Sequence, residues 1–130
     1  MTVLVVCTGN TCRSPMAEHL LRARGVAASS AGTDVAVLGE PMAGHALVCL
    51  EGTGVDGSAH RARRLTADLL DVDVVLAMTE EHRAAVLALR PDVRVVVLDV
   101  PDPYGGTLAD YRACCDALDR ALREVVPPVG

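Results

Sequence analysis

The sequence contains no phenylalanine and no tryptophan, and tyrosine occurs only twice in 130 residues. The hydrophobic core must therefore be built from aliphatic side chains. Rings that would stack on nucleic-acid bases are missing, and the net charge of −5 gives no reason to expect a polyanionic partner. We therefore expect no nucleic acid among the partners of this chain.

Long apolar runs are also absent, since none reaches the roughly 18 residues that a membrane span needs, and no charged segment of a signal peptide opens the chain. We expect a cytoplasmic protein without membrane contact, acting as a monomer or a weak dimer. The cysteines number five. An odd number in a chain without an export signal argues against a disulfide framework.

Apolar runs with strand character alternate with segments of helical periodicity along the whole chain. Such alternation implies an α/β domain with helices on both faces of a parallel sheet. We expect one three-layer domain over residues 1–126 and a frayed tail over 127–130. The expected sheet has four parallel strands in the flavodoxin-like order 2-1-3-4. The expected strands are residues 3–6, 26–31, 72–78 and 93–98.

The segments between and after these strands predict four helices and, in addition, a short helix through Leu70 that Thr66 can cap. The first covers residues 14–24 and carries Glu18 on its outer face. The second begins at Pro41. Thr79 and Thr107 stand at the starts of the third and fourth helices, as capping residues do.

The segment Cys-Thr-Gly-Asn-Thr-Cys-Arg at residues 7–13 stands between the first strand and the first helix. A strand that enters a helix through a short Gly/Asn loop directs several backbone N–H groups at one point, which makes an anion site. Cys7 supplies a nucleophile and Arg13 a bidentate phosphate clamp. The segment therefore predicts a phosphate cradle with a thiolate at its base.

A cysteine that ends an apolar strand is most often only a small buried hydrophobe. Here the helix N-terminus, the inward N–H groups and Arg13 favour the thiolate of Cys7, which can attack phosphorus. The chain contains neither the Gly-Lys-Ser/Thr of a Walker loop nor a Gly-x-Gly-x-x-Gly fingerprint. The usual nucleotide sites therefore lack support.

Cleavage of a phosphate ester also needs an acid for the leaving group. Asp102 follows the carboxyl end of the fourth expected strand, at the sheet edge where the Cys7 loop must open. Pro103 pushes Asp102 toward extended geometry. An aspartate beside prolines is more commonly just a turn residue, but this position makes Asp102 the candidate general acid.

Together these segments closely resemble the low-molecular-weight protein tyrosine phosphatase family. The resemblance implies a cysteine-dependent protein phosphatase that uses neither a metal nor another cofactor. It implies that Cys7 attacks the phosphoryl group while Asp102 protonates the leaving group, and that Asp102 then activates the water that hydrolyses the phosphocysteine. Arg13 would hold the oxygens in both steps. The matching segments are residues 6–18, 30–33, 60–63, 77–79 and 102–106.

The resemblance also assigns roles around the cradle. The family's hydrogen-bond network behind the loop is matched by Asn10, Ser14, Ser30 and His60. Without the resemblance, Ser30 would be a strand-end serine and His60 a solvated histidine. The residues expected to bind phosphate are Thr8, Gly9, Asn10, Thr11, Cys12 and Ser14.

The substrate is predicted from Thr11 and Tyr104, which would flank it. Tyrosine phosphatases of the family usually carry a bulky aliphatic residue at the position of Thr11, and Thr11 with Asp-Pro-Tyr-Gly-Gly resembles the bacterial protein arginine phosphatase branch. We favour phosphoarginine and keep phosphotyrosine as the alternative. A hydroxyl can orient a guanidinium, and Asp102 can accept its N–H groups. The alternative interpretation is that Thr11 has no effect on substrate choice and that the phosphatase has broad specificity.

Two other functions remain open. The same fold serves thioredoxin-coupled arsenate reductases, which need two further cysteines on a mobile segment. Cys49, Cys114 and Cys115 instead fall on expected helices. A phosphopeptide-binding module without activity is disfavoured, because a nucleophile, a clamp and an acid are all present.

The remaining cysteine and histidine positions have simpler interpretations. Cys12 either packs under the loop or, as the family suggests, condenses with an oxidised Cys7 and protects it. We expect His19, His45 and His82 to be surface histidines. No second cysteine pair supports a zinc site.

Overall fold

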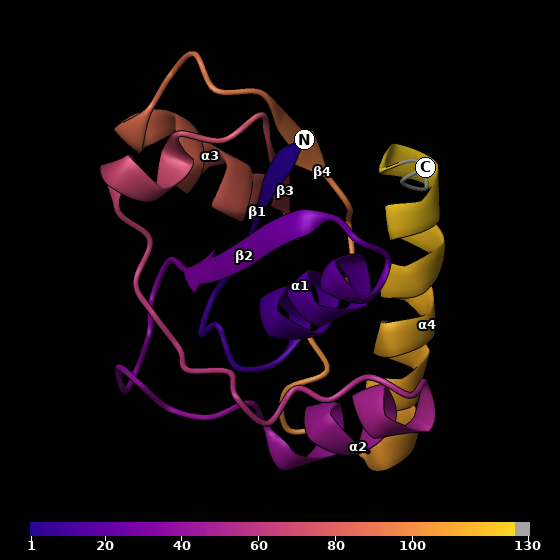
Figure 1. Cartoon of the computed structure of the whole chain (residues 1–130). Helices are drawn as coiled ribbons and strands as arrows, with labels where there is room; N and C mark the ends of the chain where they lie inside the picture. The colour runs from indigo at the N-terminus through magenta and orange to yellow at the C-terminus, as the bar shows by residue number, and fades with distance from the viewer. Residues whose placement is uncertain (127–130) are drawn as a thin grey trace.

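The computed structural model describes residues 1–126, so the predicted frayed tail at 127–130 lies outside the described residues. Figure 1 shows a twisted sheet flanked by helices. All strand pairs are parallel and the strand order is β2-β1-β3-β4, which confirms the predicted α/β fold and its order 2-1-3-4. The strands are β1 (Thr2–Cys7), β2 (Ala27–Gly32), β3 (Val74–Ala77) and β4 (Val95–Val97).

Helices cover both faces of the sheet (Figure 1). One face carries α1 (Arg13–Ala23), α2 (Gly44–Gly52) and α4 (Leu108–Val125). The other face carries the 3₁₀ helix η1 (Ala67–Leu70) and α3 (Glu80–Leu89).

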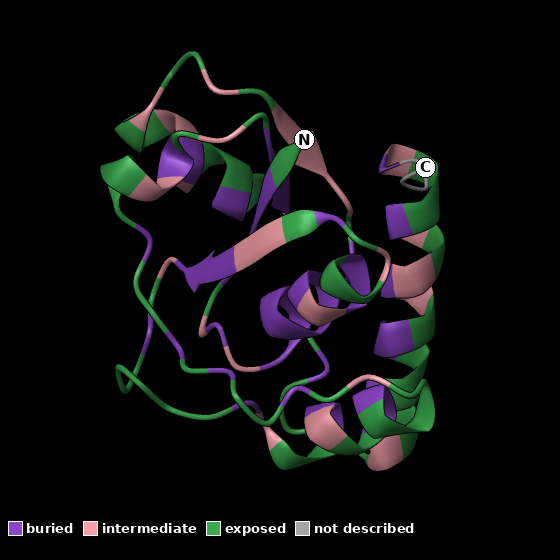
Figure 2. Cartoon of the chain, viewed as in Figure 1, coloured by how far each residue is buried: buried purple, intermediate pink, exposed green. Residues whose placement is uncertain are grey.

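The side chains of β1 divide between two separate cores, as the two-residue repeat of a strand requires. Val3 and Val5 join the core beneath α1 and α4, whereas Leu4 and Val6 pack on the side of α3. Figure 2 shows the result: α1 is largely buried, and α4 is exposed along its outer side. Within residues 1–126, no helix has both the length and the apolar character needed to cross a membrane.

The strand register brings the loops after β1, β2 and β3 to one edge of the sheet. Cys7 pairs with Gly32 at the end of β2, and Val6 pairs with Ala77 at the end of β3. Ligands bind at this carboxyl edge in open parallel sheets. The edge therefore fixes where the functional side chains converge.

The second helix begins at Gly44 rather than at Pro41, so the predicted start was wrong. The residues before Gly44 are held by bonds to other segments. The Ala43 N–H donates to the Thr11 carbonyl at 2.8 Å, and the Glu40 carbonyl accepts from Ala62 N at 2.8 Å. These bonds hold the chain beside the Cys7–Arg13 loop in a non-helical conformation, so the helix begins only at Gly44. The predicted cap at Thr107 is present, because its hydroxyl accepts from Asp110 N at 3.2 Å.

Gly32 lets β2 press against the loop that follows β1. A Cβ atom at Gly32 would clash with the Thr8 carbonyl oxygen. We expect Gly32→Ala to lower the free energy of unfolding by about 1–3 kcal/mol through overpacking. Chemical denaturation measures this loss.

Gly44→Ala is the matched control, since nothing lies within 4 Å of a Cβ atom built at Gly44. That variant should be as stable as the wild type or slightly more stable, because alanine favours helix. Equal unfolding midpoints for Gly32→Ala and Gly44→Ala would contradict the close approach of β2 to the loop.

Candidate active site

Residues 8–12 form a tight loop between the end of β1 and the start of α1. Asn10 adopts a left-handed backbone conformation with φ of 56°, which asparagine tolerates better than most residues. Because α1 begins at Arg13, the unpaired N–H groups of its first turn face the loop. Cys7, at the end of β1, is only 3% exposed and lies at the base of this arrangement.

The Ser14 hydroxyl contacts the Cys7 sulfur, with Oγ and Sγ 2.8 Å apart. The same Oγ accepts a hydrogen bond of 2.8 Å from Nδ2 of Asn10. The Ser14 proton is therefore free to point at Cys7. A hydroxyl that donates to sulfur stabilises the thiolate form of a cysteine.

Asn10 connects the loop to segments distant in sequence. It is fully buried, and its Nδ2 also donates to Ser30 Oγ at 2.9 Å. Its Oδ1 accepts from the backbone N–H of Arg63 at 2.9 Å, and its carbonyl oxygen lies 2.7 Å from His60 Nε2. The structure thus brings together Asn10, Ser14, Ser30 and His60, the four residues assigned to a network behind the loop.

His60 acts in this network as a neutral donor. Since the Asn10 carbonyl can only accept, Nε2 of His60 must carry the proton in their hydrogen bond. His60 is 6% exposed, and burial lowers its pKa below the usual 6.5. The imidazole is therefore neutral at pH 7.

Glu18 is buried, so its predicted place on the outer face of α1 was wrong. Its carboxylate accepts from Ser30 Oγ at 2.6 Å and from Arg22 at 3.1 Å, and it is 8% exposed. The helical spacing is correct, but β2 places Ser30 above this side of α1. Glu18 thereby anchors the far end of the Asn10 network.

Arg13 is held before any substrate arrives. It is 4% exposed, and its NH1 donates to the Val100 carbonyl at 3.0 Å. Its NH2 lies 3.7 Å from Oδ2 of Asp102. The other Asp102 oxygen accepts from the Tyr104 N–H at 3.0 Å. The structure therefore places the predicted clamp and the predicted acid side by side.

Cys12 lies beneath the loop, 7% exposed, with its sulfur 3.9 Å from Oδ1 of Asp102. Burial and the negative charge of Asp102 raise the pKa of the Cys12 thiol to about 12. Cys12 is therefore a thiol at neutral pH, and its protective reaction with an oxidised Cys7 stays a prediction.

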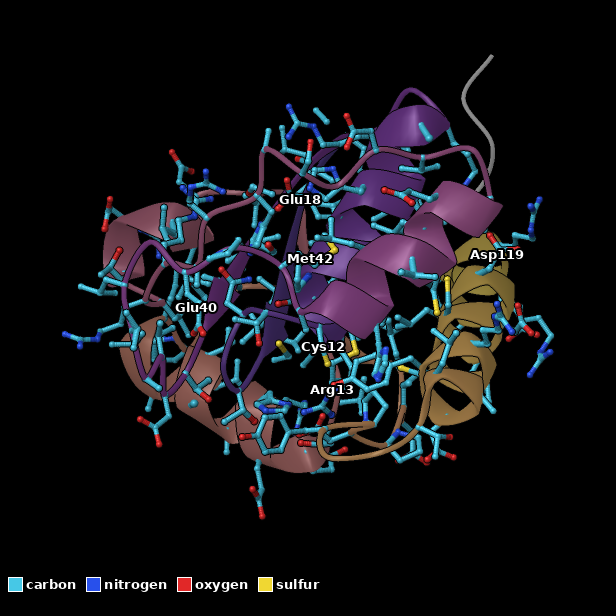
Figure 3. All side chains as sticks on the ribbon, turned by 90° about the horizontal axis from the view of Figure 1, so that it is seen from below. Cys12, Arg13, Glu18, Glu40, Met42 and Asp119 are labelled. Carbon is cyan, nitrogen blue, oxygen red and sulfur yellow. The ribbon has the colours of Figure 1, made fainter. Side chains whose placement is uncertain are left out.

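A cavity of about 440 Å³ opens over Cys7 and Arg13. Thr11, Asp102 and Tyr104 line it, as do Val37 and Glu40 from the segment before α2. Tyr104 is 82% exposed at the rim. Figure 3 shows Cys12 and Arg13 at the start of α1 with Glu40 on the segment beside them. In residues 1–126, no three His, Cys, Asp or Glu side chains gather as a metal site would require.

His82 was missed. It was predicted to lie at the surface, but it is 5% exposed. Its Nε2 lies 2.8 Å from Oγ1 of Thr8, in the loop. The only signal in the sequence is its place in the first turn of the helix after β3, at the carboxyl edge of the sheet. His19 is partly buried and His45 is exposed.

Comparison with known proteins identifies close relatives along nearly the whole chain. Residues 2–129 match the family described as low molecular weight phosphotyrosine protein phosphatase. The chain is 37% identical to the low molecular weight protein-tyrosine-phosphatase Etp of Escherichia coli K12, covering 95% of this chain and 90% of that protein. It is 36% identical to a protein-arginine-phosphatase of Geobacillus stearothermophilus, with coverage of 92% and 90%.

Solved structures agree with this similarity. The crystal structure of the Erwinia amylovora tyrosine phosphatase amsI superposes with a TM-score of 0.90, at 31% identity and with 96% of this chain and 90% of that chain covered. The YwlE arginine phosphatase from Geobacillus stearothermophilus gives a TM-score of 0.88, at 34% identity and with coverage of 95% and 89%.

The contact between Ser14 and Cys7 predicts a specific effect on thiol reactivity. Ser14→Ala removes the hydroxyl that faces the sulfur, so we expect Cys7 to react about tenfold more slowly with iodoacetamide at pH 7. Stopped time courses analysed by mass spectrometry measure this rate. Burial raises the pKa of Cys12, Cys49, Cys114 and Cys115, to about 12 for Cys114 and about 11 for Cys115, so these four thiols react slowly with the reagent.

Ser29→Ala is the control, because Ser29 lies on β2 next to Ser30 but outside the network. Its alkylation rate should equal that of the wild type. If Ser14→Ala also reacts at the wild-type rate, the Ser14 hydroxyl does not stabilise the thiolate.

Proposed function

The chain belongs to the low molecular weight phosphotyrosine protein phosphatase family, and we propose that within this family it acts preferentially on phosphoarginine in proteins. The chain is a protein phosphatase, as predicted, and its substrates are phosphorylated proteins. Its identities to the tyrosine phosphatase and the arginine phosphatase are nearly equal, at 37% and 36%. Overall similarity therefore does not decide the preference, and individual residues must.

In the proposed reaction, the Cys7 thiolate attacks phosphorus and the bond from phosphorus to the substrate nitrogen breaks. Asp102 gives its proton to that nitrogen, so the substrate side chain leaves as a guanidinium. The phosphoryl group is then bonded to the sulfur. Asp102, now a carboxylate, takes a proton from a water molecule that attacks phosphorus, and inorganic phosphate leaves with return of the thiolate.

Arg13 and the N–H groups of the loop hold the three equatorial oxygens during both steps. Thr8, Gly9, Asn10, Thr11 and Cys12 contribute to this cradle. The contact of Arg13 with Asp102, at 3.7 Å, supports a common site for the clamp and the acid. A mutant of the related YwlE arginine phosphatase carries a phosphorylated active-site serine, which supports covalent transfer to the residue at the base of the loop.

The cavity wall supports the preference for phosphoarginine. Thr11 presents a hydroxyl where a bulky aliphatic residue would narrow the opening. Glu40 supplies a carboxylate to the lining, and the carboxyl group of Asp102 keeps an oxygen that can accept a hydrogen bond. Arg13 is the single basic side chain among the residues that line this cavity. A guanidinium carries several N–H donors and positive charge, so it needs acceptors of this kind. A tyrosine ring needs none.

Phosphotyrosine is the second candidate. The exposed ring of Tyr104 lines the cavity and can pack against a substrate ring. This arrangement would suit an aromatic substrate independently of the carboxylates. A direct comparison of the two substrates decides between them.

The remaining proposals concern the setting of the enzyme. We place it in the cytoplasm, as a monomer or weak dimer that works without a cofactor. The cysteines of the described chain are all free, which suits a reducing compartment. Cys49, Cys114 and Cys115 are buried on α2 and α4. Those positions disfavour a thioredoxin-coupled arsenate reductase, whose cysteines must move.

Thr11→Ile tests the substrate preference. The isoleucine removes the hydroxyl and narrows the cavity, so we expect kcat/KM for a phosphoarginine peptide to fall about tenfold while that for a phosphotyrosine peptide is kept or rises. Phosphate release from peptides that differ only in the phosphorylated residue gives both values. Thr66→Ile, at an exposed position before η1, is the control. A wild type that does not hydrolyse phosphoarginine would overturn the preference.

Glu40→Gln tests the acidic rim separately. Removal of the charge should lower kcat/KM for phosphoarginine by a factor of about three to ten, because an exposed carboxylate attracts a cationic group only moderately. The loss should shrink at high salt. Phosphotyrosine hydrolysis should be unchanged. Glu51→Gln, at the exposed end of α2, should change neither activity, and equal behaviour of the two variants would rule Glu40 out.

A further inference from the structure

We propose that His82 is a positioning residue of this phosphatase, and that it holds the phosphate loop in its working conformation through the side chain of Thr8. The inference rests on the proposed role of the loop in phosphate binding. It adds to that proposal a role for α3 in holding the phosphate loop. Two hydrogen bonds and the burial of the imidazole carry the argument.

The imidazole of His82 lies between two threonine hydroxyls. Nε2 is 2.8 Å from Oγ1 of Thr8, and Nδ1 is 3.0 Å from Oγ1 of Thr79. The residue is 5% exposed, so water does not compete for these atoms. Both ring nitrogens are satisfied, which fixes the orientation of the ring about its side-chain bonds.

The hydroxyl of Thr79 contacts His82 and does not cap its own helix. Thr79 occupies the N-cap position of α3, where a threonine hydroxyl usually accepts a backbone N–H of the first turn. Its hydroxyl makes no such bond here. The contact with Nδ1 of His82 takes its place. This departure from the usual helix cap is expected where a side chain is being oriented for function.

Thr8 needs a bond on the side of α3 because the backbone bonds around it lead to the residues that follow β2. The Cys7 carbonyl accepts from Thr33 N at 2.9 Å, and the Thr8 carbonyl accepts from Asp34 N at 3.0 Å. In a trans peptide the N–H points opposite to the C=O. These two bonds therefore turn the N–H groups of Thr8 and Gly9 away from the end of β2.

His82 holds the loop from the opposite side, the side of β3 and α3. The loop is thus fixed between the residues that follow β2 and the start of α3, which meet at the carboxyl edge of the sheet. Without His82, Thr8 could pivot about its bonds to Thr33 and Asp34, and the N–H groups next to Cys7 would lose their common direction. Such N–H donors stabilise a phosphoryl group effectively only when they already point at its binding position before it binds.

The charged groups that influence His82 come from three segments. Burial lowers the pKa of His82 first and Arg13 lowers it further, while Glu81 on the same helix and Asp102 raise it. The pKa therefore lies below 6.5, and the ring is neutral at pH 7. One ring nitrogen then donates and the other accepts, which both threonine hydroxyls can match.

The test compares His82→Leu, His82→Gln and Thr8→Val with the wild type. We expect kcat to fall about tenfold and the inhibition constants of inorganic phosphate and vanadate to rise about tenfold in His82→Leu and Thr8→Val. The double variant should lose no more than either single one, because both remove the same bond. His82→Gln, whose amide can reach Thr8, should recover much of the loss.

Val86→Ala is the matched control for stability. Val86 is fully buried on α3 and packs in the core on that side of the sheet, away from the loop. It should lower the unfolding temperature without changing kcat or phosphate inhibition per folded molecule. If His82→Leu behaves in the same way as Val86→Ala, His82 is only structural and the proposal is wrong.

Further outcomes separate this inference from the proposed function. If His82→Leu does not fold, Thr8→Val and His82→Gln decide alone: wild-type kcat and phosphate inhibition in Thr8→Val would overturn the inference. A wild type that binds neither phosphate nor vanadate would instead overturn the proposed function of the loop. An active wild type with an additive double variant would overturn the role of His82 alone.

Discussion

The buried amide of Asn10 is the interaction on which the active site depends. A left-handed conformation at a residue other than glycine costs about 1–3 kcal/mol, and it persists only where surrounding contacts enforce it. Here the amide donates to Ser14 and Ser30 and accepts from the backbone of Arg63. A buried polar network of this kind is stabilising only when all its members are bonded. The loop, β2 and the segment before η1 therefore depend on one another for their positions.

The sheet explains why so few residues can organise so many segments. β1 lies at the centre, between β2 and β3, so the loop after it is reached from both sides. Ser30 approaches from β2, His82 from the start of α3, and Asp102 from the loop that follows β4. The carboxyl edge of a parallel sheet collects these contributions, although they come from distant parts of the chain.

The sequence predicted the features that depend on local pattern. The strand order follows from the alternation of strands and helices along the chain. The loop from Cys7 to Arg13 and the position of Asp102 follow from short motifs at the ends of two strands. The burial of Glu18 and His82 could not be predicted in this way, because their partners Ser30 and Thr8 are brought to them by strands elsewhere in the chain. Local pattern identifies the reacting groups, whereas tertiary structure decides which polar groups support them.

The direction of the hydrogen bonds around Asn10 follows from one backbone group. The Arg63 N–H can only donate, so Oδ1 of Asn10 must face it and Nδ2 must face the two serines. Each serine oxygen then accepts from Nδ2, and each hydroxyl proton must go elsewhere: to Glu18 from Ser30 and to the sulfur from Ser14. A peptide group 53 positions from Asn10 thus determines that a proton points at the nucleophile. The reactivity of Cys7 is in this sense a property of the whole fold.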